Sequence, residues 1–293
     1  MISIGILSYK RTDLLIETLK DIIQTKHPIS LIILNNNVDL CILKDIEIIL
    51  NRNNLVKLTY IHHNKNYGVA IGRRVLIEHC DTKHMILLDD DVEIPDINKI
   101  IHNVVACFHK NKDIKGIAFN IKEYGINKHN KYEIPHKNKK INMNEDFYTY
   151  LMIGAGHAVD VEVVRSIGNY PDDFCLYGFE EIDVAFRIIN ANYKIKYLCD
   201  CVVLHKKSPD GRFSNEKVNE LAFINRTKMA KRYFSKKYFY SCLIVRSVFF
   251  LIKTKNIKLF LSLIKEIKDD KKTNKFGSQF YKYIKSVNGF IYW

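Results

Sequence analysis

Short runs of aliphatic residues alternate with segments of helical periodicity through the first half of the chain. The runs lie at residues 2–7, 31–34, 57–61 and 85–88. Their β-branched, apolar character is typical of strands buried on both faces. Between them, apolar residues recur at helical spacing after a candidate N-cap at Thr12 or Asp13, and again over residues 41–50 and 68–79. This order predicts right-handed crossovers and an α/β fold with a mostly parallel, Rossmann-like sheet flanked by helices.

The pattern is less regular after residue 94. Pro95 is placed to open a helix with its apolar face on residues 97–108, and a strand is expected near residues 116–120. A polar stretch rich in Lys and Asn, residues 122–146, predicts a surface insertion. Residues 147–153 resume β character and end in Gly154-Ala155-Gly156, where the backbone can approach a ligand closely.

From Asn215 onward the pattern predicts one helix after another. We therefore divide the chain into a sheet domain, residues 1–214, and a helical C-terminal region, residues 215–293. Charge supports this division. The chain carries a net charge of +14, yet its last 69 residues hold 17 Lys and Arg against three Asp and Glu, so the preceding 224 residues sum to zero. This asymmetry predicts a neutral globular domain with a basic appendage that meets an anionic partner.

The C-terminal region interleaves lysines with aliphatic and aromatic residues, which favours a membrane surface as that partner. Its most apolar stretch, residues 238–253, contains Arg246 and is shorter than a membrane span requires. Lipid headgroups are expected to meet Lys228, Lys231, Arg232, Lys236 and Lys237, and acyl chains to meet Phe249, Phe250, Leu251, Leu259 and Phe260. Two alternatives remain: a helical subdomain packed on the sheet domain with solvated lysines, and a nucleic-acid-binding tail. Apolar runs fit lipid better than a phosphate backbone, so no nucleic-acid partner is expected.

Two further features concern the compartment. The seven cysteines are scattered without a CxxC pair, which indicates a reducing environment. Met1 leads directly into the first expected strand. These features predict a cytoplasmic protein, and the basic C-terminal region adds peripheral attachment to the inner face of the cell membrane.

Ligand-binding and catalytic residues are expected where the strands end, because ligands of such sheets bind beyond the carboxyl ends of the strands. Asp89, Asp90 and Asp91 directly follow the run at 85–88. Adjacent carboxylates repel one another unless a cation relieves them, and oxygen ligands beside phosphate suit Mg²⁺ or Mn²⁺. The alternative for this triplet is a solvated acidic turn.

Two further sets of residues are candidates for the same site. Glu180 and Glu181 begin an amphipathic segment in which Asp183 and Arg187 are spaced for an i, i+4 ion pair. A carboxylate at a helix N-terminus can act as a general base, although a capped helix alone would explain the pattern. His205 ends the β-run 202–204, and neutral imidazole is a common Mn²⁺ ligand, although a lone strand-end histidine is more often unrelated to metal.

Taken in order, these groups and their neighbours match a series of motifs that resembles glycosyltransferase family 2, the inverting nucleotide-sugar transferases of the GT-A fold. The matching segments are an opening strand and turn at residues 4–11, a second strand end at 34–37, an N-x-G-x-x-x-A-R-like segment at 66–73, a DxD motif at 89–91, a G-x-E-D-like motif at 178–181 and a late histidine at 205. The resemblance covers roughly the first two thirds of the chain.

The resemblance implies a role for each matching residue. Nucleotide-sugar binding falls to Ser8, Tyr9, Arg11, Asn35, Arg73, Asp89 and Asp90. Among these, Tyr9 is expected to stack on the base, Asn35 to bond its edge and Asp89 to hold the ribose. Asp91 and His205 are expected to bind a Mn²⁺ or Mg²⁺ cofactor, and Glu181 to be the catalytic base with Glu180 beside it. Asn35, Arg74 and Glu181 depart from the usual Asp, Asn and Asp.

The resulting hypothesis is a metal-dependent, hexosyltransferase-type enzyme of surface-polysaccharide biosynthesis. It takes a sugar from a nucleotide-sugar donor, expected to be a UDP-sugar, and passes it with inversion to a glycan or lipid-linked acceptor. One alternative is a sugar nucleotidyltransferase, which usually has a glycine-rich loop after the first strand, whereas residues 8–11 contain no glycine. A non-catalytic basic protein that binds membrane or nucleic acid is the other.

Overall fold

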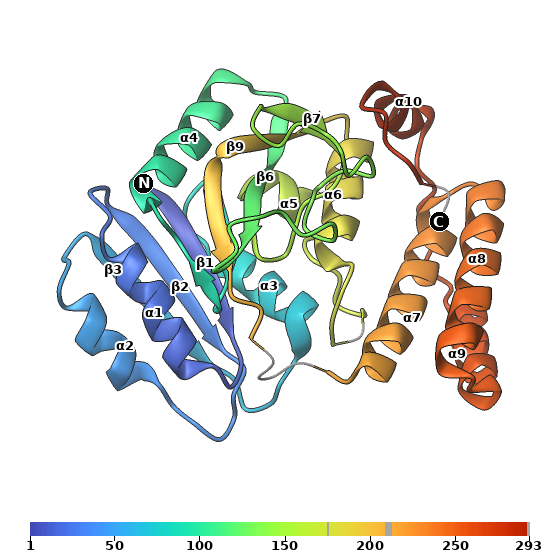
Figure 1. Ribbon diagram of the computed structural model, residues 1–293, viewed down its shortest axis with the longest axis horizontal. Coiled ribbons are helices and arrows are strands. Elements are labelled where there is room, and N and C mark those ends of the chain that lie inside the picture. Colours follow the sequence, from blue (N-terminus) through green and yellow to red (C-terminus); the bar gives the residue numbers. More distant parts are fainter. Residues whose placement is uncertain (175, 209–212, 292–293) are drawn as a thin grey trace.

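A nine-stranded sheet forms the centre of the protein, with helices on both faces (Figure 1). The computed structural model describes residues 1–174, 176–208 and 213–291. The strand order is β3-β2-β1-β4-β8-β6-β9-β5, and β7 pairs with β9. The strands are β1 (Ile2–Ser8), β2 (Ile29–Asn35), β3 (Val56–His62), β4 (His84–Asp89), β5 (Val92–Glu93), β6 (Ile114–Glu123), β7 (Phe147–Thr149), β8 (Gly156–Asp160) and β9 (Lys194–His205).

The first half of the sheet is parallel, as the sequence predicts. Strands β1 to β4 pair only in parallel with one another, through the helices α1 (Thr12–Ile22), α2 (Leu43–Leu50) and α3 (Gly68–Glu78). The second half is mixed, because β8 runs antiparallel between β4 and β6, and β5 and β7 run antiparallel to β9. The aliphatic runs predict burial on both faces, which parallel and central antiparallel strands share, so they do not reveal this change of direction.

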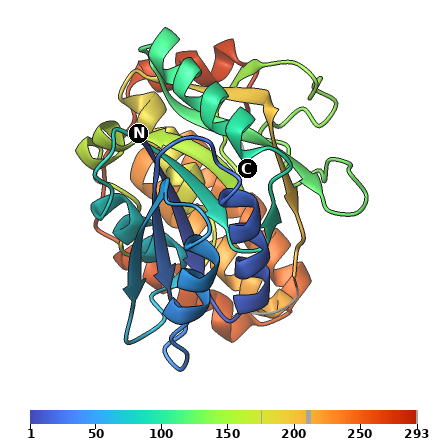
Figure 2. The ribbon, with the colours of Figure 1, turned by 90° about the vertical axis from the view of Figure 1, so that its left-hand side faces the viewer.

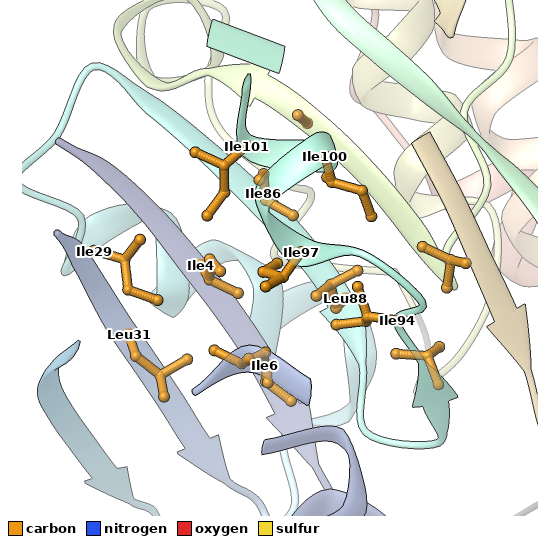
Figure 3. Close-up of a cluster of buried hydrophobic side chains, with 14 of the residues drawn as sticks. Ile4, Ile6, Ile29, Leu31, Ile86, Leu88, Ile94, Ile97, Ile100 and Ile101 are labelled. Atoms are coloured by element: carbon orange, nitrogen blue, oxygen red, sulfur yellow. The ribbon is translucent and has the colours of Figure 1, made fainter. Parts of the chain in front are cut away.

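Each face of the sheet has its own apolar core. On one face, α1, α2 and α4 (Ile97–Lys110) cover β1, β2 and β4, where Ile4, Ile6 and Ile86 pack against Ile97 and Ile100 (Figure 3). Asp96 rather than Pro95 caps α4, since its side chain accepts a hydrogen bond from the Lys99 backbone N–H.

On the other face lie α3, α5 (Val161–Ser166) and α6 (Glu180–Asn190), together with the C-terminal helices. These are α7 (Asn215–Tyr233), α8 (Lys236–Thr254), α9 (Ile257–Asp269) and α10 (Ser278–Ser286). In the turned view, α1 and α2 lie in front of the sheet and the orange-to-red C-terminal helices lie behind it (Figure 2).

The inner side of the C-terminal region packs on the sheet domain. Phe186 of α6 lies 5.8 Å from Phe234, which follows α7, and 5.4 Å from Phe280 of α10, measured between ring centroids. All three side chains are fully buried in one apolar cluster. The region that the charge pattern marks as an appendage therefore shares a core with the sheet domain.

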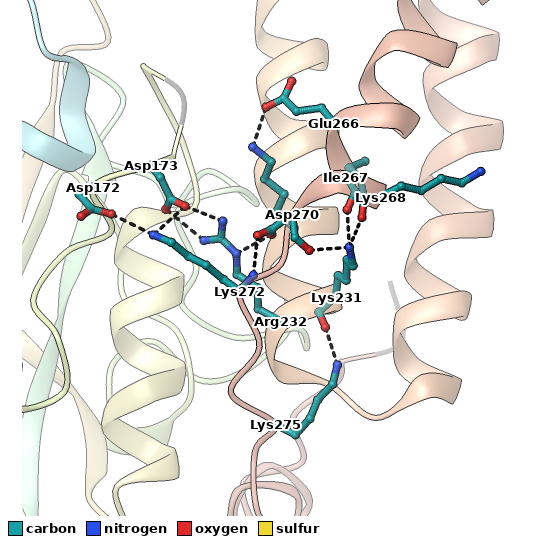
Figure 4. A network of polar contacts seen from close by, with 11 residues as sticks. Asp172, Asp173, Lys231, Arg232, Glu266, Ile267, Lys268, Asp270, Lys272 and Lys275 are labelled. Carbon is teal, nitrogen blue, oxygen red and sulfur yellow. Dashed lines mark hydrogen bonds and ion pairs between the residues drawn. The ribbon is translucent and has the colours of Figure 1, made fainter.

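Basic residues of α7 hold the C-terminal helices to one another and to the sheet domain (Figure 4). Arg232 bridges Asp270 and Asp173, at 2.7 and 2.6 Å. Lys228 pairs with Glu266 at 2.6 Å. The Lys231 ammonium donates to the backbone carbonyls of Ile267, Lys268 and Asp270, which lie at the end of α9.

These contacts correct part of the sequence-based membrane surface. Lys228, Lys231 and Arg232 serve internal packing, and the Phe250 side chain is 1% exposed, so headgroups and acyl chains cannot take them as partners. Leu251, Leu259 and Phe260 are half-buried, whereas Lys236, Lys237 and Phe249 are exposed. Over the residues that the structure describes, no helix has both the length and the apolar character needed to cross a membrane.

Candidate active site

Three strand ends converge at one edge of the sheet. Leu7 of β1 pairs with Asp89 of β4, and His205 ends β9 beside Val92 of β5. The carboxyl ends of these strands therefore bring together residues that lie more than 100 positions apart in the sequence. This is the edge at which the sequence predicts ligand binding.

The middle carboxylate of the triplet supports the turn after β1. Asp90 is fully buried; it pairs with Arg11 at 2.6 Å and accepts a hydrogen bond from the Tyr9 backbone N–H. Ser8, which is 2% exposed, also hydrogen-bonds to this carboxyl group. Burial raises the pKa of Asp90 to about 7, against the opposing effect of Arg11. Ser8 and Asp90, which the resemblance assigns to donor binding, are both enclosed, and the contacts of Asp90 hold the backbone of residues 8–11.

Arg11 and Tyr9 remain at the rim of this edge. The Arg11 side chain is 18% exposed, and its guanidinium bridges Asp90 and Asp91, with 2.7 Å to the Asp91 carboxylate. Tyr9 is half-buried, and the Lys10 ammonium lies 5.3 Å from the centre of its ring. Lys10 itself has a positive φ of 59°, so the turn places Tyr9 and Arg11 on a sharply bent backbone.

Asp89, Asp91 and His205 form a cluster suited to a divalent cation. One ligand atom from each lies within 4.8 Å of the others. The Asp91 Oδ1 atom is buried without a hydrogen-bond partner and lies 3.3 Å from His205 Nε2. Two carboxylates and an imidazole are ligands that Mn²⁺ accepts, so the residues present fit the expected cofactor. Asp89, expected at the ribose, is thus a third candidate ligand.

Glu133 is a site residue that sequence reasoning missed. Its carboxylate pairs with His205 Nδ1 at 2.5 Å and with the Lys207 ammonium at 2.8 Å, and it is 7% exposed. Burial opposes the charged imidazole, but the neighbouring carboxylates of Asp91 and Glu133 raise the pKa of His205 to about 9. A carboxylate on Nδ1 fixes the ring so that Nε2 faces the candidate metal site, an arrangement that recurs around metal-binding histidines.

Asn35, at the end of β2, uses its side chain for contacts within the protein. Asn35 is 1% exposed, and its amide nitrogen donates to the Leu40 carbonyl and the Tyr60 hydroxyl while its oxygen accepts from the Asn37 backbone N–H. These contacts order the loop after β2 and occupy the groups expected to bond a base. Its neighbour Asn36 has a buried side-chain oxygen without a hydrogen-bond partner.

Arg73 connects the metal-type cluster with the second carboxylate group. Its guanidinium, 5% exposed, lies 3.1 Å from Asp89 and 2.5 Å from Glu180, and it also donates to the Gly154 carbonyl. Burial opposes its charge, but Glu180 and Asp89 raise its pKa. A Cβ at position 154 would lie 3.0 Å from the Arg73 guanidinium. Gly154, which the sequence predicts to let a ligand approach the backbone, therefore leaves room for the Arg73 side chain.

The two glutamates differ in environment. Glu180 is 3% exposed and paired with Arg73, whereas the Glu181 side chain is 17% exposed and its carboxylate lies 4.0 Å from Arg73. Burial, followed by the negative charge of Glu180, raises the pKa of Glu181 well above the ordinary value for glutamic acid. Glu180 is therefore placed to position its neighbour, and Glu181 to exchange a proton. The expected pair of Asp183 with Arg187 is present and buried.

The C-terminal region contacts the loop that precedes Glu180 and Glu181. Gly178 and Phe179 both have positive φ, 92° and 74°, immediately before α6 begins at Glu180. The buried Asn225 side chain of α7 donates to the carbonyls of Tyr177 and Gly178. The Arg226 guanidinium lies 5.1 Å from the centre of the Phe179 ring. Sequence reasoning missed this support, since it assigned residues after 224 to a separate function.

Comparison with known sequences identifies relatives of this arrangement. Residues 3–168, more than half of the chain, match the sequence profile described as glycosyl transferase family 2. An uncharacterized protein of Haemophilus influenzae (strain ATCC 51907 / DSM 11121 / KW20 / Rd) is 37% identical over 172 residues, which cover 58% of this chain and 93% of that protein.

Solved structures share the fold at low sequence identity. GalNAc-T7 with UDP, GalNAc and Mn²⁺ has a TM-score of 0.66 and 15% identity, over 98% of this chain and 56% of its own, so this chain spans little more than half of that protein. TarS 1–349 of S. aureus with UDP-GlcNAc has a TM-score of 0.61 and 12% identity, over 91% and 80%. The mannosyltransferase PcManGT from Pyrobaculum calidifontis with GDP-Man and Mn²⁺ has 0.60 and 10%, over 97% and 78%.

Proposed function

The chain belongs to glycosyl transferase family 2, and from this membership we propose that it transfers a sugar from a UDP-sugar to a glycan or lipid-linked acceptor with inversion at the anomeric carbon. Its fold is that of GT-A glycosyltransferases, several of which hold a nucleotide or nucleotide-sugar in their solved structures. We assign the reaction to surface-polysaccharide biosynthesis at the cytoplasmic face of a cell membrane. Lipid-linked intermediates of that kind would meet a chain with a basic C-terminal region.

We assign the metal-binding role to Asp91 and His205, joined by Asp89. A Mn²⁺ or Mg²⁺ ion held there would neutralise the charge of the departing nucleoside diphosphate. Two relatives by fold were solved with Mn²⁺. The orphaned Asp91 Oδ1 and the fixed orientation of His205 support the assignment. Tyr9 and Arg11 at the rim are then assigned to the nucleotide.

We assign the base to Glu181. Its raised pKa makes the Glu181 carboxylate, in its deprotonated form, a stronger base toward an acceptor hydroxyl than an ordinary glutamate. Glu180 cannot take that role while its carboxylate is enclosed against Arg73. A base that removes the hydroxyl proton as the oxygen attacks the sugar from the face opposite the leaving group produces inversion in one displacement.

The observation that carries the proposal is the position of Arg73. One buried guanidinium contacts Asp89 of the metal-type cluster and Glu180 beside the proposed base, so both carboxylate groups belong to one site. A sugar nucleotidyltransferase would need neither this base nor its placement beside the diphosphate ligands.

A nucleotide-release screen tests the proposal. Purified protein is incubated with UDP-, GDP- and dTDP-sugars and candidate acceptors, with Mn²⁺ or with EDTA, and released nucleotide is measured. We expect UDP release that needs both Mn²⁺ and an acceptor, and a product of inverted anomeric configuration by NMR. Formation of pyrophosphate from a sugar phosphate and a nucleoside triphosphate, with no transfer from any nucleotide-sugar, would assign the nucleotidyltransferase reaction instead.

A further inference from the structure

The outward side of α8 is apolar. Tyr240, Ile244, Val248 and Ile252 recur every four residues, which places them in one row along the helix. Their exposed fractions are 54, 63, 54 and 68%. Val245 and Phe249 widen the row, and Ile257 and Leu261 of α9 are 66 and 60% exposed. We call these eight residues the α8–α9 outer face.

This face is not the one by which the helices pack. Cys242 and Phe250 of α8 are buried, as are Leu263 and Ile267 of α9, and they lie on the opposite sides of their helices. A surface helix normally turns polar residues outward. Here α8 carries apolar residues on both sides, and a contiguous exposed apolar surface of this kind marks an interaction site.

Lysines border the outer face. Lys236 and Lys237 lie at the start of α8, Lys253 near its end, and Lys258 and Lys265 on α9, all of them exposed. Within the described parts of the chain, none of these five forms an ion pair. Two of the three acidic residues after position 224 are committed elsewhere, Glu266 to Lys228 and Asp270 to Arg232. The face therefore combines exposed apolar side chains with uncompensated positive charge.

We propose that the α8–α9 outer face docks on an anionic lipid bilayer. Its apolar row would enter the boundary between headgroups and acyl chains, and its bordering lysines would contact the headgroups. A second copy of the chain fits poorly, because two such faces would bring like charges together. This inference goes beyond the proposed function, since docking requires neither donor nor metal.

The position of the face in the fold suits that role. In Figure 1, α8 and α9 lie at one end of the molecule and α2 at the other. The helix between α8 and the site is α7, whose Asn225 holds the loop before Glu180. Docking through the outer face would thus leave the inner contacts of the C-terminal region in place.

Co-sedimentation of the full chain with vesicles tests the proposal. Phosphatidylcholine vesicles containing none, one fifth or two fifths phosphatidylglycerol are compared, using the wild type and the double variant Ile244→Glu, Val248→Glu. The matched control is Ile48→Glu, because Ile48 of α2 is 62% exposed at the far end of the molecule. Circular dichroism and nucleotide release with a water-soluble acceptor confirm that each variant is folded.

We expect wild type and Ile48→Glu to sediment equally, with affinity rising with the phosphatidylglycerol content. The double variant should bind at least about tenfold more weakly, since it loses apolar burial and adds negative charge. Lys258→Glu should cost about fivefold or more, the scale for one basic residue near such a surface. Wild-type protein that stays in the supernatant, or a double variant that binds like wild type, would overturn the proposal. A dimer in sedimentation velocity that the double variant abolishes, without vesicle binding, would assign the face to a second copy.

Discussion

The candidate active site and the α8–α9 outer face differ in whether their charged side chains are paired. At the site, Arg11 lies between Asp90 and Asp91, Arg73 joins Asp89 to Glu180, and Lys207 meets Glu133. On the outer face, exposed lysines border exposed apolar side chains and find no acidic partner among the described residues. Charges that are paired inside the protein fix a geometry, whereas charges left unpaired at its surface need a partner from outside.

The two regions meet at α7. One side of this helix holds the loop before the glutamates through Asn225, and Phe223 and Ile224 join the cluster that Phe250 of α8 and Leu263 of α9 complete. The two sides of the basic C-terminal region therefore differ. Its inner side holds the loop before Glu180, and its outer side exposes the apolar residues that we propose as a docking surface.

The largest expected effect belongs to the proposed base. Glu181→Gln keeps the size of the side chain and removes its ability to accept a proton, so kcat should fall by roughly 10² to 10⁴ while UDP binding is retained. Initial-rate kinetics with calorimetric UDP titration measure both. Glu162→Gln, an exposed position on α5, is the control and should match wild type. A larger loss in Glu180→Gln with proton transfer intact in Glu181→Gln would move the base to Glu180.

The pH profile sharpens the contrast between the two glutamates. Transfer needs the deprotonated form of Glu181, so kcat/KM should decline as the pH falls through a pKa well above that of ordinary glutamic acid. In Glu180→Gln the neighbouring negative charge is gone, which lowers the pKa of Glu181. The acid limb should therefore move to lower pH. A limb that stays where it is in the wild type would mean that another group controls it.

A smaller effect is expected from the carboxylate that orients His205. Glu133→Gln weakens the contact to Nδ1, and loss of such a partner typically costs 10- to 100-fold in metal affinity. Electron paramagnetic resonance of free Mn²⁺ during titration, in the presence of UDP, measures this affinity. Glu123→Gln is matched to it, because the Glu123 carboxylate lies 3.7 Å from the same Lys207 but, among the described residues, forms no ion pair with the imidazole of His205. Equal Mn²⁺ affinity in both variants would remove Glu133 from the site.

The smallest effect tests whether the C-terminal region belongs to the catalytic unit. Asn225→Ala leaves the carbonyls of Tyr177 and Gly178 without this donor, which should lower the free energy of unfolding by about 1–3 kcal/mol. Urea denaturation measures the change, and Asn219→Ala on the same helix is the control. The turnover should fall with the stability, since the loop positions Glu181. Identical unfolding in the two variants would mean that α7 does not brace the loop.

Much of the fold was predictable from sequence, because its signals are local. The strands expected at 2–7, 31–34, 57–61 and 85–88 are observed with one or two more residues at their ends. The direction of β8, however, depends on which neighbours it meets in the sheet. No periodicity within residues 156–160 encodes that choice.

The site was predictable only where its residues stand in sequence motifs. Asp89, Asp91 and His205 are brought together as the motifs imply. Glu133 pairs with His205 across 72 positions from within a polar insertion, and no local pattern separates it from its neighbours. The surroundings of Asp90 and Asn35 also depend on tertiary contacts, since both side chains are buried and find partners within the protein that no local sequence pattern reveals.

The most direct test of the central claim is the metal dependence of nucleotide binding at Asp91. Calorimetry of UDP binding is carried out with Mn²⁺ and with EDTA, on wild type and on Asp91→Asn. In wild type, Mn²⁺ should tighten UDP binding, because Asp91, Asp89 and His205 can share one ion. In Asp91→Asn that tightening should disappear. An Asp91→Asn protein whose UDP affinity still rises with Mn²⁺ as in the wild type would contradict the claim that this cluster is the metal site.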